Sequence, residues 1–222
     1  RKISLENGFK DATTCPLVQG EPYYLGSTFE SQLKEDGPVI LTPGMQLGHE
    51  QDDPIDGFQS LGKQLGLPKS RLKEAYKKAT LVQEAMQAEM LEMGRQVLAE
   101  LEQDPDQIGV VLFGRPYNAF MPEANKGIPH KFASRGIKLI PVDFLDLKDA
   151  EIRDHMYWTM GQINLKGAAI VEAHPQLFGT FITNFSCGPD SFVVGYFRSI
   201  MGTKPSLTLE LDNHTADAGL ET

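Results

Sequence analysis

Both cysteines of the chain stand just before a proline. Cys15 directly precedes Pro16, and Cys187 lies two residues before Pro189. Proline is favoured in the first turn of a helix, because its missing N–H would have no partner there and its φ is already close to the helical value. The sequence therefore predicts each cysteine at the start of a helix. Unpaired backbone N–H groups and the positive end of the helix dipole favour a thiolate at such a position, and a thiolate can bind a metal or attack an electrophile.

The elements on either side of Cys187 can be predicted from its neighbours. The β-branched and aromatic run 180–185 is typical of a strand, and apolar residues recur at helical spacing over 189–201. Cys187 is thus expected where a strand passes into a helix. The alternative is an inert cysteine, since free cysteine is commonly a small buried hydrophobic residue.

A second polar loop is Gly114-Arg115-Pro116-Tyr117-Asn118, which follows a short apolar run. It contains neither of the glycine-rich phosphate-loop patterns. Arg115 carries a planar, permanently charged fork suited to a carboxylate, a phosphate or a carbonyl, and Tyr117 and Asn118 add directional polar groups. The alternative is that Arg115 forms a salt bridge within the turn.

Two histidines are further candidates for chemistry. His174 follows an apolar run, and His214 lies in the polar segment 212–217. Either could serve as the base of a thiol enzyme whose nucleophile is Cys187, which would require a cysteine that alkylates rapidly near neutral pH. The sequence has no HxxH, HExxH or CxxC pattern, so the spacing of residues alone gives little indication of a metal site.

Strand and helix patterns alternate from residue 105 onward. The strands are expected at Gly109–Phe113, Lys138–Val142, Ala168–Glu172, Thr180–Phe185 and Ser206–Leu211, and the helices at Glu123–Arg135, Ala150–Asn164 and Pro189–Met201. Near-continuous apolar strands are buried on both faces, as in a mainly parallel sheet covered by helices. The predicted fold class is α/β, Rossmann-like or flavodoxin-like. Ligands are then expected in the loops that follow the strands.

The preceding part of the chain has a different organisation. One helical pattern runs from about 68 to 103, interrupted by Gly94 at a cost of about 1 kcal/mol relative to alanine. Residues 1–57 are irregular and turn-rich, with a short strand expected at Pro38–Leu41. We therefore predict a partial first lobe over 1–67, a long bridging helix over 68–104 and a second α/β lobe over 105–222.

Composition limits the classes of partner and the compartment. The formal net charge is −9 and the isoelectric point is about 5.0, which argues against nucleic acid and anionic membranes and favours a protein or a small molecule. There is no apolar run near the roughly 20 residues of a membrane span. Two cysteines are too few for a secreted disulfide framework, so a cytoplasmic protein is expected. The chain begins with Arg1 rather than methionine, and we expect it to be a piece of a longer protein.

Four motifs together resemble a known family. They are CPLVQGEPYYL around Cys15, GRPYN with NKGIP after the first strand of the second lobe, NFSCGPDSF around Cys187, and DNHTADAG around His214. In this order they resemble the 2-hydroxyacyl-CoA dehydratase D-component and double-cubane-cluster superfamily, in the version found in the C-terminal region of large acyl-CoA dehydratase activases.

The resemblance implies an iron–sulfur protein with a 4Fe-4S cubane between two lobes. Cys15 and Cys187 match two of the family's three cysteine ligands, and the third has no counterpart in this chain. Because two thiolates cannot by themselves hold a cubane, we expect the isolated chain to lack the cluster that its parent carries. By the same resemblance, these residues would line the cluster turn or the cleft: Arg115, Tyr117, Asn118, Ser186, Gly188, Ser191 and His214.

The implied chemistry is low-potential electron transfer, with an activase ATPase domain as the partner in the same polypeptide. Whether the chain is itself an enzyme is left open. The alternative function is an α/β module without a cluster, which binds an acyl-CoA or docks the ATPase domain. A third cysteine upstream of Arg1 would favour the redox function.

Overall fold

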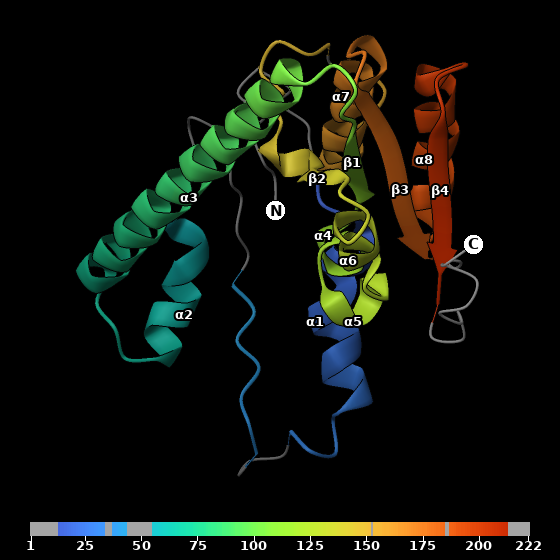
Figure 1. Ribbon diagram of the computed structural model, residues 1–222. Helices are drawn as coiled ribbons and strands as arrows, with labels where there is room; N and C mark the ends of the chain where they lie inside the picture. Colours follow the sequence, from blue (N-terminus) through green and yellow to red (C-terminus); the bar gives the residue numbers. More distant parts are fainter. Residues whose placement is uncertain (1–12, 34–36, 44–54, 152, 185–186, 213–222) are drawn as a thin grey trace. The chain divides into compact units, whose positions relative to one another are not determined.

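The computed structural model describes residues 13–33, 37–43, 55–151, 153–184 and 187–212 (Figure 1). The chain forms two compact units. The first contains residues up to Met86 together with Met156–Thr159, and the second contains Gln87–His155 and the residues from Met160 onward. Each unit is described by itself below.

The second unit contains a four-stranded parallel sheet. Its strands are β1 (Gly109–Gly114), β2 (Lys138–Pro141), β3 (Leu177–Asn184) and β4 (Ser206–Leu211), in the order β2-β1-β3-β4. This is the order of the first four strands of a flavodoxin-like sheet. The prediction of an α/β fold with a parallel sheet is confirmed.

Helices connect these parallel strands. The short helices α4 (Pro116–Ala119), α5 (Pro122–Asn125) and α6 (Ile128–Ala133) lie between β1 and β2, followed after β2 by the 3₁₀ turn η2 (Val142–Phe144). Helix α7 (Thr159–Ala173) leads into β3, and α8 (Gly188–Met201) joins β3 to β4. Parallel neighbours require such crossovers, because a tight hairpin can join only antiparallel strands.

Alternation along the strands gives the sheet two apolar faces. On one face, Leu112 and Ile182 pack with Ala119 and Ile128 from the α4–α6 segment. On the other face lie the rings of the following residues, with centroids 5.0–6.4 Å apart: Phe113, Phe181 and Phe197. Because successive side chains of a strand point to opposite faces, residues next to each other in sequence supply both cores.

Three predicted elements of this half are wrong. The helix expected at Glu123–Arg135 is divided into α5 and α6, because Lys126 and Gly127 between them have a left-handed backbone. The apolar run Ala168–Glu172 belongs to helix α7 rather than to a strand, and the helix expected at Ala150–Asn164 begins at Thr159 instead. Val171 and Leu165 are buried, so most of α7 is enclosed. A short apolar run has the same appearance in a buried helix and in a buried strand, which explains the error at Ala168–Glu172. With this run assigned to a strand, the predicted helix before it begins too early in the chain.

The long helix α3 runs from Lys69 to Gln103, as the periodicity predicts. Gly94 has a packing role on this helix: a Cβ atom there would lie 1.9 Å from the carbonyl oxygen of Phe144. The glycine therefore lets the backbone of α3 approach the turn η2 closely. Glycine's low helix propensity is offset by this contact.

The first unit contains helix α1 (Pro16–Thr28), the 3₁₀ turn η1 (Asp56–Phe58), helix α2 (Gln59–Gln64) and the beginning of α3. The strand expected at Pro38–Leu41 is absent from the described segment 37–43. Val39 is 76% exposed, so its β-branched side chain has no neighbouring layer to pack against.

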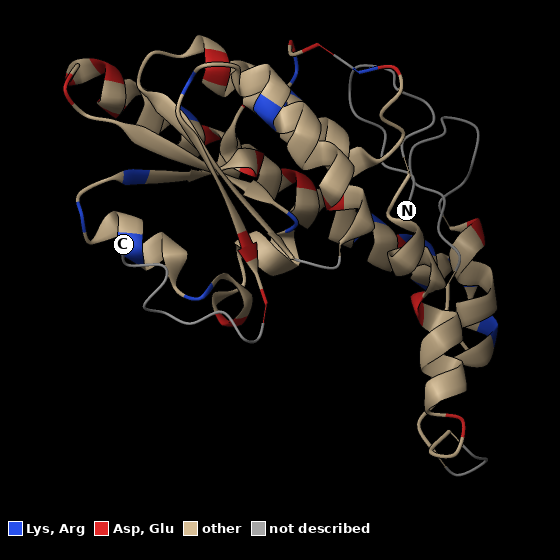
Figure 2. Ribbon diagram, turned by 90° about the vertical axis from the view of Figure 1, so that its right-hand side faces the viewer, with Lys and Arg blue, Asp and Glu red and all other residues tan. Residues whose placement is uncertain are grey.

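Charged residues are interspersed along the described elements, as Figure 2 shows, and no described helix or strand is basic throughout. Within the described residues, no helix is both long and apolar enough to cross a membrane.

Candidate functional site

The candidate site lies where the direction of the strand order changes. β1 and β3 are neighbours in the sheet; the connection that leaves β1 runs to β2 on one side, whereas the connection that leaves β3 runs to β4 on the other. In open α/β sheets, ligands bind beyond the carboxyl ends of the strands at such a point. Arg115 directly follows β1, and Cys187 follows β3 by three residues. The fold therefore brings these two predicted residues to one edge of the sheet.

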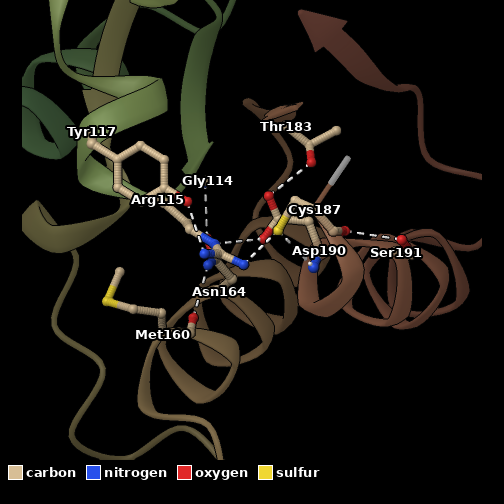
Figure 3. A network of polar contacts seen from close by, with 9 residues as sticks. All are labelled: Gly114, Arg115, Tyr117, Met160, Asn164, Thr183, Cys187, Asp190 and Ser191. Carbon is tan, nitrogen blue, oxygen red and sulfur yellow. Dashed lines mark hydrogen bonds and ion pairs between the residues drawn. The ribbon is translucent and has the colours of Figure 1, made fainter. Parts of the chain in front are cut away.

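Arg115 is buried and forms a network of polar contacts (Figure 3). Its Nε donates to Oδ1 of Asp190 at 3.0 Å, and its Nη1 donates to the hydroxyl of Tyr117 at 2.7 Å. Its Nη2 donates to the sulfur of Cys187. The guanidinium thus has partners in all three directions of its fork, and an external anion would compete with them.

Asp190 holds this network in place from the first turn of α8. Its Oδ2 accepts a hydrogen bond from the Thr183 hydroxyl at 2.7 Å, so each carboxylate oxygen has a partner. Asp190 is almost fully buried. A buried charge requires such partners, because an unpaired carboxylate would lose the stabilisation that water provides.

Cys187 is the N-cap residue of α8. Its sulfur accepts a hydrogen bond from the backbone N–H of Asp190 at 3.3 Å, while its own N–H donates to the carbonyl oxygen of Asn184 at 3.0 Å. Ser191 returns to this turn, since its hydroxyl donates to the Cys187 carbonyl at 3.0 Å. The predicted position of Cys187 at the start of a helix is confirmed.

The predicted ionisation of Cys187 is wrong. Burial raises the pKa of its thiol to about 11, although the hydrogen bond from the Asp190 backbone lowers the pKa. The negative charge of the Asp190 carboxylate adds to the increase. Burial disfavours the charged form of a thiol. These effects outweigh the helix N-terminus and the charge of Arg115, so Cys187 is a thiol near neutral pH.

Gly114 sets the start of the Arg115 loop. Its φ is +136°, and a Cβ atom there would lie 2.4 Å from the carbonyl oxygen of Ile182. Its N–H donates to Oδ1 of Asn164 at 3.1 Å, and Nδ2 of Asn164 donates to the carbonyl oxygen of Met160 at 2.7 Å. Helix α7 thereby fixes the loop from which Arg115 extends.

Sequence reasoning missed Asp190, Thr183 and Asn164. Asp190 carried a usable signal, because an acidic residue in the first turn of a predicted helix is favoured by the dipole and lies beside its N-cap. Thr183 and Asn164 carried none, since their roles depend on pairings across β1, β3 and α7.

The remaining candidate residues differ in their surroundings. Tyr117 is 49% exposed, whereas Asn118 is buried and its Nδ2 has no hydrogen-bond partner among the described residues. A Cβ atom on Gly188 would meet open space. Ser186 and His214 lie outside the described residues.

Neither His174 nor Cys15 is among the residues of the polar network drawn in Figure 3. Nδ1 of His174 accepts from the backbone N–H of Gln176 at 3.2 Å, and burial lowers the pKa of this histidine. Cys15 belongs to the first unit, where it is buried at the N-cap of α1.

The fit of a cubane cluster to the described residues is incomplete. They contain no group of three or more His, Cys, Asp or Glu side chains that could hold a metal ion. In the second unit they offer the sulfur of Cys187, while the nearby carboxylate of Asp190 is already bound by Arg115 and Thr183. A cubane normally takes four ligands, so further ligands would be needed.

Comparison with protein families identifies the chain. Residues 2–145 match the family described as the CoA enzyme activase uncharacterised domain (DUF2229). The chain belongs to this family. The match runs from the first unit through η2 of the second unit, and so includes Cys15 and the Arg115 loop, whereas Cys187 lies beyond it. No curated protein matches the chain. No solved structure matches it either.

Proposed function

We propose that this activase-family domain takes part in low-potential electron transfer within an ATP-dependent CoA enzyme activase system. In this proposal Cys15 and Cys187 are ligands of an iron–sulfur cluster, and the ATPase domain lies in the same polypeptide. Membership of the activase family supports the assignment to such a system. The small number of cysteines, two in the chain, is in keeping with a cytoplasmic location.

The observation that carries the proposal is the environment of Cys187. Ser, Thr, Asp and Asn are the preferred N-cap residues, so a cysteine is an unusual choice for capping α8 alone. Its sulfur lies at the switch point of the sheet, where it accepts hydrogen bonds from the backbone N–H of Asp190 and from Nη2 of Arg115. Hydrogen bonds of this kind orient and stabilise a sulfur that binds a metal.

The raised pKa of Cys187 is compatible with this role. A bound metal deprotonates a coordinating thiol outright, because the interaction with the cation replaces the proton. Binding of a metal to Cys187 would therefore release the proton of its thiol. The ligands still needed for a cubane would come from residues other than those described.

The proposal is tested by measuring iron and acid-labile sulfide, together with the electron paramagnetic resonance spectrum. The protein is extended upstream of Arg1 to include any further cysteine and is reconstituted without oxygen, beside its Cys187→Ala variant. About four irons per chain that are lost in the variant would support the proposal. Iron at background in both proteins would contradict it.

A second candidate is an α/β module without a cluster, which binds an acyl-CoA or docks the ATPase domain. Asn118 favours it, because this buried side chain beside the switch point has an Nδ2 donor without a partner among the described residues. A ligand carbonyl or phosphate could accept that hydrogen bond. Calorimetric titration with acetyl-CoA tests this candidate, and heats equal to those of dilution would remove the acyl-CoA version of it.

A further inference from the structure

Arg115 makes more contacts than a structural ion pair requires. Its Nε alone satisfies Asp190, whose other oxygen is bound by Thr183. A buried ion pair is weak evidence for a purely stabilising role, since apolar residues of similar volume often stabilise a fold equally well. The other donors of the fork are directed at Tyr117 and at the sulfur of Cys187.

This arrangement fixes the guanidinium beside the sulfur. Asp190 holds the Nε edge at 3.0 Å, and the Tyr117 hydroxyl holds Nη1 at 2.7 Å, which leaves Nη2 on the sulfur. The same Asp190 contributes its backbone N–H to this sulfur at 3.3 Å. One residue of α8 therefore positions both groups that donate to Cys187.

We propose that Arg115 is the positioning residue of this site: it orients the Cys187 sulfur and places a fixed positive charge against it. The inference rests on the proposed function only in taking Cys187 as the functional group. Anything bound to the sulfur would then meet the cation of Arg115, from the loop after β1, and the backbone N–H of Asp190, from α8. The charge favours negatively charged partners of the sulfur over neutral ones of the same size.

Alkylation with two reagents tests this inference. Iodoacetate and iodoacetamide both form an S–C bond with the Cys187 thiolate and release iodide, but only iodoacetate is negatively charged. The ratio of their rate constants does not depend on the fraction of thiolate, because both reagents consume the same species. Mass spectrometry of the peptide that contains Cys187 measures each rate separately from Cys15.

In Arg115→Gln we expect the iodoacetate to iodoacetamide ratio to fall about 5–10-fold, because the nearest positive charge is lost. Arg115→Met combined with Asp190→Leu replaces the ion pair by apolar residues and keeps the fold testable should the single variant not fold. The ratio should fall in this double variant too. The control is Arg198→Gln, which removes an exposed arginine from the last turn of α8 and should leave the ratio unchanged.

A merely structural role for Arg115 would open the site and raise both rates together. If the ratio falls in Arg115→Gln but is unchanged in the double variant, the inference is overturned. The lower iodoacetate rate would then come from the unpaired negative charge of Asp190 rather than from the loss of the Arg115 charge. Iron content of the same variants in the upstream-extended protein separates the two proposals. A changed ratio without iron in any version upholds the inference and contradicts the proposed function, whereas bound iron with unchanged ratios does the reverse.

Discussion

Nε of Arg115 lies 3.0 Å from Oδ1 of Asp190, although 75 residues separate them along the chain. The ion pair joins the loop after β1 to the first turn of α8, and both side chains are buried. Removing one member of such a pair leaves the other charge without compensation in a poorly solvated place. The pair is therefore expected to be important for stability as well as for the position of Cys187.

Asp190→Asn should lower the free energy of unfolding by about 3–5 kcal/mol, since it leaves the guanidinium of Arg115 buried and uncompensated. Urea denaturation followed by circular dichroism measures this loss. Arg95→Gln is the matched control, because Arg95 and Glu92 form an exposed pair at 3.0 Å on α3. That pair should contribute less than about 1 kcal/mol, and equal losses in the two variants would contradict the prediction.

The Cys187 region shows how far the sequence predicted the site. Proline near each cysteine predicted the two helix starts, and the helix and strand patterns predicted β1, β4, α3 and α8 closely. The contact between Arg115 and Cys187 could not be predicted, since it depends on β1 and β3 becoming neighbours in the sheet. Likewise, the thiolate expectation considered only the helix N-terminus, whereas burial and the Asp190 carboxylate depend on the folded structure.

Alkylation of Cys187 by iodoacetamide should be slow at pH 7.5 and should keep rising with pH toward about 11. The thiolate is the reactive species, and burial disfavours it throughout this range. Rates for the peptide that contains Cys187, measured from pH 7 to 10.5, check this behaviour. A plateau below pH 9 would show a low-pKa thiol and would restore the thiol-enzyme hypothesis.

The same shift has a consequence for stability. Because the pKa of Cys187 is higher in the folded state than the ordinary value of 9.0, the unfolded chain binds fewer protons between pH 9 and about 11. Stability is therefore lost as pH rises through this window. The difference in unfolding free energy between the wild type and Cys187→Ala should become less favourable to the wild type from pH 8 to 10.5, and a constant difference would contradict the shift.

Lys204 satisfies the C-terminal end of α7 from the turn before β4. Its Nζ donates to the carbonyl oxygens of Val171 at 2.6 Å and Glu172 at 3.2 Å, and also to that of His174. Lys204→Met should cost about 1–3 kcal/mol, because these terminal carbonyls lose a charged donor. Lys77→Met on the exposed face of α3 is the control, with an expected change within about 0.5 kcal/mol. Similar midpoints of thermal unfolding for the two variants would argue against a capping role.

Gly94 and Gly195 provide a paired test of backbone packing. Helix propensity alone predicts that alanine stabilises either position by about 1 kcal/mol. At Gly94, however, the new Cβ would lie 1.9 Å from the Phe144 carbonyl oxygen, so α3 or the turn η2 must move. At the exposed Gly195 of α8 nothing lies within 4 Å of the new atom.

We therefore expect Gly94→Ala to destabilise the protein by about 1–3 kcal/mol, as overpacking does, and Gly195→Ala to stabilise it by about 0.5–1 kcal/mol. Urea denaturation of the two variants gives both signs in one experiment. Stabilisation by both substitutions would mean that α3 does not approach Phe144 closely. Opposite signs would show that the glycine of the long helix is required by packing, which its sequence pattern alone could not reveal.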